Sequence, residues 1–201
     1  ERGLYDDTLI VFTSDHGEEF CEHGGFWHGL SLYEEQIAIP LMMKLPGNQN
    51  AGKRNPAIAR HLDIAPTLTG FAGLQPDDQW KGINLFDAAL EPANGETAFT
   101  YAHLDFEGIV LRAVRDMQYK LIESNEGNKR GFAPVELYDL AADRGETANL
   151  AGAADQSERV SELREVIAGM VRFIMEGAAA PVVDSDAMED QRELLESVGY
   201  L

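Results

Sequence analysis

Three of the five histidines lie in one glycine-rich segment, residues 13–29, with the sequence TSDHGEEFCEHGGFWHG. Asp15 and His16 offer a carboxylate oxygen and an imidazole nitrogen from adjacent residues, and both could face a single divalent cation. Such a donor pair suits calcium, manganese or zinc, and the ligands still missing would decide among them. The same residues also fit a turn in which Asp15 accepts backbone hydrogen bonds and no metal binds.

His23 and His28 flank the sequence GGFW at the end of this segment. The His28 ring could meet an anion as a hydrogen-bond donor or a proton carrier. Alternatively, His28 is a histidine of a surface loop. The neighbouring carboxylates could orient the histidines, or they could simply be solvated; they belong to Glu18, Glu19 and Glu22.

The chain shows no obvious nucleophile. A Gly-x-Ser-x-Gly elbow, a phosphate-binding glycine loop and a Cys-x-x-Cys pair are all absent from the sequence. The single cysteine, Cys21, excludes an intrachain disulfide, and we interpret it as a buried apolar side chain.

Elements on both sides of the histidines must position them. The β-branched run at residues 8–15 predicts a buried parallel strand that ends at the carboxyl edge of a sheet, where open α/β sheets bind ligands. Residues 31–37 predict a short helix, residues 37–47 a second buried strand, and residues 57–74 a longer helix.

The pattern then changes to short alternating runs, which predict an antiparallel meander whose last strand is ELYDL. Apolar residues next recur at helical spacing from Val160 to Ile174. The helix is predicted to stop at Gly177, and a linker with a short terminal helix is expected after it.

The composition excludes some kinds of partner. The formal net charge of −19 argues against nucleic acid, because phosphate binding depends on Lys and Arg. An anionic substrate would instead need a local positive centre such as a metal ion. No apolar stretch is long enough to cross a bilayer, and the first residues do not read as an export signal.

The ordered series of motifs resembles the C-terminal half of a sulfatase of the alkaline-phosphatase-like superfamily. The matching stretches are LIVFTSDHGEEFCEHGGFWHGLSLYEEQIAIPLMMKLPG, LDIAPTLTGFAGL, KGINLF, AVRDMQYKLIES, ELYDLAADRGETANLA and the ending LLESVGYL. The resemblance implies an α/β fold. Residues 1–93 would form the C-terminal portion of an alkaline-phosphatase-like sandwich, residues 94–177 a small antiparallel sheet packed with a helix, and residues 178–201 a linker with a terminal helix.

The resemblance also implies roles for four residues. Asp15 and His16 match the pair that ligates a divalent cation, most often Ca²⁺, with Mn²⁺ or Zn²⁺ as the less common choices. His28 matches the residue that binds the sulfate group, and it would stabilise developing charge or protonate the leaving oxygen. His23 matches a position where contact with the substrate is possible, but the family pattern supports this contact less strongly than it supports the role of His28.

The chain departs from the sulfatase pattern in one respect. The C/S-x-P-x-R segment that carries the nucleophile is absent, as is the early Asp-Asp metal pair, and Cys21 does not match that motif. We therefore expect a C-terminal fragment of a longer sulfatase that is inactive alone. An incomplete catalytic sheet would expose an apolar edge, so we also expect self-association.

The expected partner of the full-length enzyme is a sulfated small molecule or a sulfated glycan. Bacterial relatives are commonly periplasmic or secreted, but the sequence does not decide the compartment. One alternative is a fragment of a related phosphoethanolamine or phosphoglycerol transferase, or of a phosphonate or phosphodiester hydrolase. Another is a non-catalytic binding or assembly module.

Overall fold

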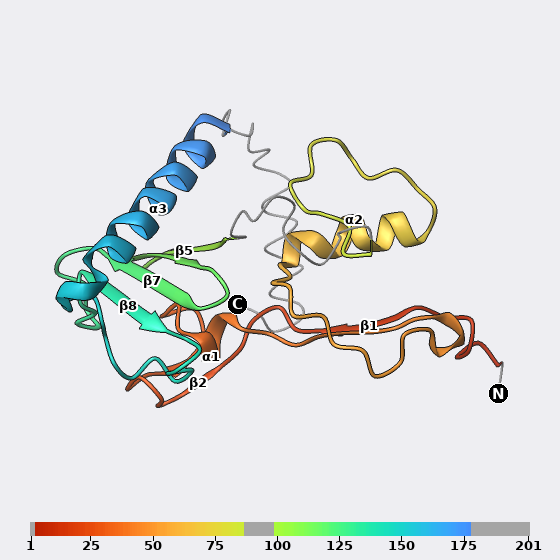
Figure 1. Cartoon of the computed structure of the whole chain (residues 1–201), viewed down its shortest axis with the longest axis horizontal. Coiled ribbons are helices and arrows are strands. Elements are labelled where there is room, and N and C mark those ends of the chain that lie inside the picture. The colour runs from red at the N-terminus through yellow and green to blue at the C-terminus, as the bar shows by residue number, and fades with distance from the viewer. Residues whose placement is uncertain (1–2, 87–98, 178–201) are drawn as a thin grey trace. The chain divides into compact units, whose positions relative to one another are not determined.

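The computed structural model describes residues 3–86 and 99–177 (Figure 1). Contacts divide the chain into a unit of Glu1–Ile167 and a unit of Ala168–Leu201, and the description below concerns the first. The predicted boundary at residues 93 and 94 and the predicted terminal helix lie outside the described residues. Within the described ranges, no helix has the length and apolar character needed to span a membrane.

Strand β1 (Ile10–Thr13) pairs with β4 (Leu41–Lys44), and the pairing is antiparallel, with Ile10 opposite Lys44. The predicted parallel, buried arrangement is therefore wrong. Phe12 is 58% exposed and Met42 57% exposed, so one face of the pair meets solvent. A short apolar run has the same composition in either kind of strand, and only packing distinguishes them.

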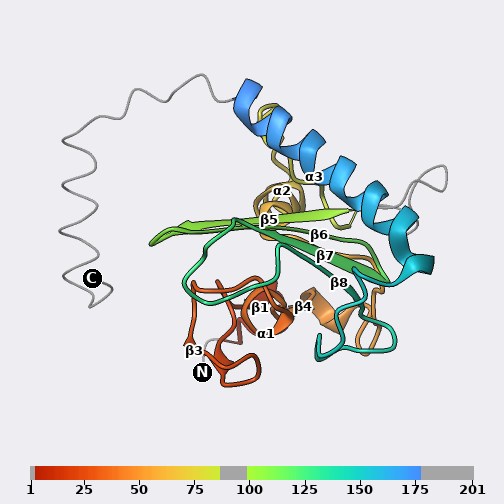
Figure 2. The same ribbon diagram turned by 90° about the vertical axis from the view of Figure 1, so that its left-hand side faces the viewer.

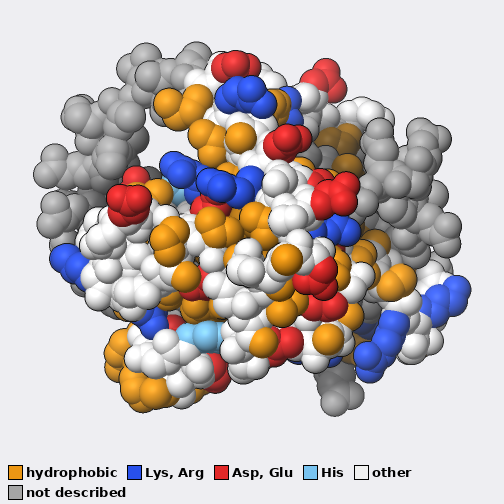
Figure 3. Space-filling view, turned by 60° about the vertical axis from the view of Figure 1, so that its left-hand side comes forward, with side chains coloured by type: hydrophobic (Ala, Val, Ile, Leu, Met, Phe, Trp, Pro, Cys, Tyr) orange, Lys and Arg blue, Asp and Glu red, His pale blue; other side chains and the backbone are white. Residues whose placement is uncertain are grey.

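A small hairpin and a one-turn helix connect these strands. β2 (Glu19–Phe20) pairs with β3 (Phe26–Trp27), and α1 (Glu34–Ile37) follows as predicted. Cys21 is exposed rather than buried, because it occupies the turn of the hairpin at φ +80°. Figure 3 shows such exposed hydrophobic side chains among charged ones on one face of the molecule.

A short 3₁₀ turn, Pro46–Asn48, follows β4, and α2 (His61–Phe71) lies within the predicted helix. Asp63 is fully buried in the first turn of α2, where its carboxylate accepts a 2.8 Å hydrogen bond from the backbone N–H of Arg60. The Arg60 guanidinium lies 2.8 Å from the same carboxylate, so the charge of Asp63 is compensated.

The predicted meander is confirmed. Strands β5 (Thr100–Phe106), β6 (Ile109–Arg115), β7 (Tyr119–Ser124) and β8 (Val135–Asp139) form an antiparallel sheet in the order β5-β6-β7-β8. After a 3₁₀ turn at Ala154–Gln156, the predicted helix is present as α3 (Ser157–Gly177).

Both faces of this sheet are covered. Val114, Leu121 and Leu137 are in register and fully buried, on the face along which the first part of α3 runs (Figure 2). That part of α3 buries Leu163 and Ile167. On the opposite face, sheet residues join a core with Leu32 and Tyr33 from the segment that leads into α1; they are Ile109, Leu111, Ala113, Ile122 and Tyr138.

Candidate functional site

Asp15 and His16 lie just beyond the end of β1, and both reach solvent. Asp15 Oδ2 is 3.6 Å from His16 Nε2, while Asp15 Oδ1 accepts a 3.0 Å hydrogen bond from the backbone N–H of His16. His16 Nδ1 lies 2.7 Å from the carbonyl oxygen of Gly17 and donates to it, so in the neutral ring Nε2 keeps its lone pair. A carboxylate oxygen and an imidazole nitrogen with a lone pair therefore lie side by side.

Gly17 brings this pair against α1. Its backbone N–H donates a 2.8 Å hydrogen bond to the carbonyl of Gln36. A Cβ at position 17 would lie only 2.0 Å from the carbonyl oxygen of Glu35, so no other residue fits without moving the backbone. The glycine after Asp15 and His16 is thus required by the close approach of the helix.

His28 joins the same site from the other end of the loop. Its ring stacks on the His16 ring with centroids 4.0 Å apart and planes inclined by 27°. His28 Nδ1 lies 3.3 Å from Glu18 Oε2, and the His28 side chain is 48% exposed. The Glu18 carboxylate can therefore orient the His28 ring through Nδ1.

His23 is placed in a separate, buried cluster. Its Nδ1 lies 2.7 Å from Glu35 Oε1, its Nε2 lies 3.1 Å from the carbonyl oxygen of Glu146, and its ring stacks on Tyr33 at 3.6 Å. Burial lowers the pKa of His23, but the hydrogen bonds to Glu35 and Glu146 outweigh it and raise the pKa above its usual value. The structure thus brings Asp15, His16 and His28 together and places His23 apart from them.

The loop between His16 and His28 is also anchored through Glu19, which has no exposed surface. Arg130, from the turn between β7 and β8, contacts both carboxylate oxygens of Glu19 at 3.2 Å. Gly25 N–H and Gln36 Nε2 donate to the same carboxylate at 2.7 and 2.8 Å. Burial raises the pKa of Glu19, but the Arg130 contacts and these hydrogen bonds lower it below the usual range.

A second buried ion cluster joins α1 to the sheet. Lys120, fully buried on β7, lies 3.1 Å from Glu34 and 2.8 Å from Glu146 Oε1. Arg115 on β6 also pairs with Glu34. Burial raises the pKa of Glu146, although Lys120 opposes the shift. Sequence reasoning missed Arg130, Lys120 and Glu146, because each acts on residues about a hundred positions away and no local motif marks it.

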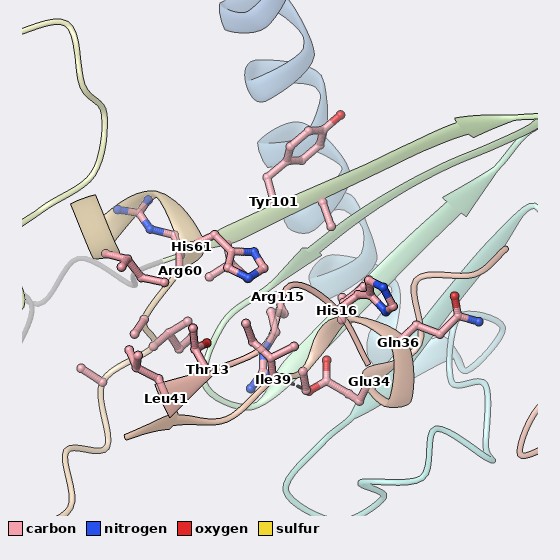
Figure 4. A pocket seen from close by; sticks show the side chains of 18 of the residues that line it. Thr13, His16, Glu34, Gln36, Ile39, Leu41, Arg60, His61, Tyr101 and Arg115 are labelled. Atoms are coloured by element: carbon pink, nitrogen blue, oxygen red, sulfur yellow. Dashed lines mark hydrogen bonds and ion pairs between the residues drawn. The ribbon is translucent and has the colours of Figure 1, made fainter. Parts of the chain in front are cut away.

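A pocket of about 490 Å³ adjoins Asp15 and His16 (Figure 4). Its walls include Ile39, Leu41 and His61, a residue that sequence reasoning did not assign to the site. His61 Nε2 lies 2.9 Å from the carbonyl oxygen of Ser14, so α2 is tied to the end of β1. The site can therefore admit a group of moderate size beside the Asp15 and His16 pair.

The donor set suits part of a metal site. Calcium takes six to eight oxygen ligands, and zinc or manganese accept mixed oxygen and nitrogen donors. Asp15 and His16 supply one donor of each kind at a separation of 3.6 Å. Among residues 3–86 and 99–177, no group of three or more His, Cys, Asp or Glu side chains could hold a metal. The pair fits a divalent cation only as a portion of its coordination sphere.

Comparison with known proteins gives consistent matches. The family model for the C-terminal part of N-sulphoglucosamine sulphohydrolase matches residues 21–172. An N-acetylglucosamine-6-O-sulfatase of Bacteroides thetaiotaomicron is 32% identical over 174 residues, which cover 82% of this chain and 30% of that relative. The chain thus spans about a third of the length of the curated relatives that it matches.

Solved structures agree with the family match. One, a protein in complex with its substrate D-glucosamine-2-N,6-O-disulfate, matches with a TM-score of 0.74 and 27% identity over 91% of this chain and 37% of its own. The phosphonate monoester hydrolase of Agrobacterium radiobacter matches with a TM-score of 0.67 and 28% identity over 85% of this chain and 36% of its own.

Proposed function

Since this chain belongs to the N-sulphoglucosamine sulphohydrolase C-terminal family, we propose that it is the metal- and sulfate-binding portion of a sulfatase, a hydrolase of sulfuric esters. The fold supports this premise, because the predicted alkaline-phosphatase-like α/β class is confirmed by structural neighbours among the sulfatases. The observation that carries the proposal is the stacking of His28 on His16 beside the Asp15 carboxylate.

In this proposal Asp15 and His16 hold a divalent cation, with Ca²⁺ favoured over Mn²⁺ and Zn²⁺. When bound, such a cation polarises sulfate oxygens as a Lewis acid. The hydrogen bond from His16 Nδ1 to Gly17 supports the assignment, because it fixes the tautomer that ligation through Nε2 requires. The remaining ligands come from parts of the longer enzyme.

His28 binds the sulfate group and serves as the catalytic residue of this portion. The Glu18 carboxylate accepts a hydrogen bond from its Nδ1, and Nε2 can donate to a sulfate oxygen when the ring carries a second proton there. When the bond between sulfur and the leaving oxygen breaks, a proton from His28 can neutralise that oxygen. The nucleophile that bonds to sulfur is absent from this chain, so we expect no turnover by the chain alone.

Calcium titration tests the metal assignment. Wild-type chain is titrated with Ca²⁺ by calorimetry beside Asp15→Asn and His16→Gln, and we expect each variant to weaken binding about tenfold or more, as loss of a ligand does. Asp155→Asn is the matched control, since Asp155 is exposed and lies in the 3₁₀ turn before α3. Equal calcium affinities for wild type and Asp15→Asn would contradict the metal assignment.

The proposed substrate is a sulfated small molecule or glycan, and a sulfated amino sugar is the favoured class. The neighbour solved with D-glucosamine-2-N,6-O-disulfate supports this choice, as does the N-acetylglucosamine-6-O-sulfatase relative. We expect glucosamine-6-sulfate to shift the ring NMR signals of His28, and desulfated glucosamine to leave them unchanged. Equal shifts with both sugars would contradict sulfate binding by His28.

A second candidate is a phosphonate or phosphodiester hydrolase, which the likeness to the phosphonate monoester hydrolase supports. Methylphosphonate monoester in the same NMR titration distinguishes the two candidates. Shifts of His28 by the phosphonate alone would favour the hydrolase of phosphorus esters. Shifts by neither anion in the calcium-loaded chain would favour a non-catalytic module.

A further inference from the structure

The contacts of His23 require a proton on both ring nitrogens. Nδ1 faces the Glu35 carboxylate at 2.7 Å, and Nε2 faces the Glu146 carbonyl oxygen at 3.1 Å. Both groups are acceptors, so a neutral imidazole, which has a single N–H, can satisfy only one of them. The doubly protonated, positively charged ring satisfies both.

Glu146 supplies the backbone carbonyl that His23 Nε2 contacts. It follows β8, has only 1% of its surface exposed and adopts φ +51°, a conformation that few residues other than glycine accept. Its carboxylate accepts a 2.6 Å hydrogen bond from the N–H of Glu34 and pairs with Lys120. The loop after β8 therefore contacts both the first residue of α1 and the histidine-rich segment.

The hydrogen bonds of His23 attach the loop to the rest of the fold at a position between His16 and His28 in the sequence. His16 and His28 stack on each other, and His23 lies between them in the sequence, inside the molecule. The Arg130 contacts of Glu19 tie down the first part of the same loop. The second part, from Gly24 to His28, is tied to Glu19 through the Gly25 N–H, but it contains the hairpin strand β3, whose side chains Phe26 and Trp27 are exposed.

We propose that His23 is a positioning residue: as an imidazolium it joins the loop that carries His28 to Glu35 of α1 and to the backbone of Glu146, and so holds His28 against His16. This inference rests on the proposed function, in which His16 and His28 share one ligand. It assigns His23 to the support of the site, where the sequence predicted a weaker substrate-side contact.

The groups facing His23 fix the direction of its pH dependence. They are the Glu35 carboxylate, the Glu146 carbonyl and carboxylate, and the Tyr33 ring. Since the pKa of His23 is raised in the folded chain, its contribution is complete below about pH 6.5 and is lost as the pH rises through the folded-state pKa. We therefore expect the His28 ring to be held less firmly against His16 above the folded-state pKa of His23 than below it.

The test compares His23→Gln with His103→Gln, a matched change at an exposed histidine on β5. Ring NMR signals report the stacking of His16 and His28 without any metal. We expect His23→Gln to remove the ring-current shifts of both histidines at pH 6, and His103→Gln to preserve them. Preserved shifts in a folded His23→Gln chain would overturn the inference.

Calcium affinity supplies a readout that a purely structural role would not produce. We expect the affinity of wild type to exceed that of His23→Gln by about tenfold at pH 6, as for residues that orient metal ligands. This ratio should shrink as the pH rises, and taking the ratio cancels protonation of His16, which both chains share. A ratio constant with pH would overturn the inference.

Two further observations separate the possible failures. If wild type binds no calcium, the expectation that Asp15 and His16 bind the cation without the remaining ligands fails, while the NMR comparison still tests His23. If His23→Gln does not fold, Glu35→Gln replaces it, because the amide keeps an acceptor for Nδ1 but removes the charge. We expect Glu35→Gln to lower the pKa of His23 and to lose the ring-current shifts at a lower pH than wild type does. An unchanged pH profile in Glu35→Gln would contradict the role of the charge.

Discussion

The two strand regions of the chain differ in how completely they are covered. The sheet β5 to β8 buries Val114, Leu121 and Leu137 on one face and a second core on the other. The pair β1 and β4 exposes Ile10, Phe12 and Met42 instead. The candidate site lies at the end of the poorly covered pair, while buried Lys120 on the sheet and Arg130 in one of its turns supply cations that pair with carboxylates near the site.

The two strand regions therefore have different roles. An exposed two-stranded pair is marginal by itself and cannot fix catalytic geometry. Lys120 on β7 pairs with Glu34 and Glu146, and Arg130 in the turn between β7 and β8 pairs with Glu19. The sheet therefore acts as a frame for the loop that carries the proposed ligands.

The largest effect should come from breaking this frame at Lys120. Lys120→Met leaves Glu146 buried without its cation, and we expect a loss of about 3–5 kcal/mol in the free energy of unfolding. Urea unfolding followed by circular dichroism measures it. Lys129→Met, at an exposed lysine, is the control and should change stability by less than about 0.5 kcal/mol. Similar stabilities for the two variants would show that the buried cluster does not support the fold.

A matched pair of truncations compares the two strand regions directly. Leu137→Ala removes a fully buried side chain from β8 and should cost about 2–5 kcal/mol, through lost burial and a cavity. Phe12→Ala on β1 should cost about 0.5 kcal/mol or less, since Phe12 is 58% exposed. Equal costs in urea unfolding would mean that the β1 and β4 pair is covered in solution.

An acid titration sharpens the comparison at Glu19. Because its folded-state pKa is lowered, the ionised carboxylate contributes stability above about pH 4.5, and this contribution is lost as the pH falls through the lower folded-state pKa. Glu19→Gln should therefore be less stable than wild type at pH 7, and the gap should narrow below pH 4.5. Glu126→Gln, an exposed control, should follow wild type at every pH. A gap independent of pH would contradict the role of the charge.

Sequence patterns predicted the elements better than their partners. The meander and α3 were predicted because alternating and helical spacings are local signals. The antiparallel pairing of β1 with β4 was not, since the composition of a four-residue run does not encode the direction of its neighbour. Exposure of Cys21 was also missed, because burial statistics for cysteine ignore the hairpin turn that it occupies.

The candidate site was predicted in part for a similar reason. Asp15 and His16 are adjacent in sequence, so their proximity required no knowledge of the fold. The role of His28 in sulfate binding was expected only from family resemblance, and neither its stacking on His16 nor the anchoring by Arg130 and Glu146 was expected. The contacts of Arg130 with Glu19 and of Glu146 with His23 link residues more than a hundred positions apart. The roles of Asp15, His16 and His28 in metal and sulfate binding stay predictions.

The smallest effect in free energy concerns the exposed strand pair itself. β1 and β4 each have one unpaired edge within the described ranges, and an apolar face beside such an edge favours pairing with a second copy of the chain. We expect the weight-average mass in sedimentation to rise with concentration.

Phe12→Lys should suppress this rise, because it places a charge on the exposed face of β1. Met117→Lys, at an exposed methionine in the turn between β6 and β7, should leave it unchanged. A wild-type mass that stays monomeric at every concentration would show that this face does not drive association, and an equal response to both lysines would assign it to net charge alone.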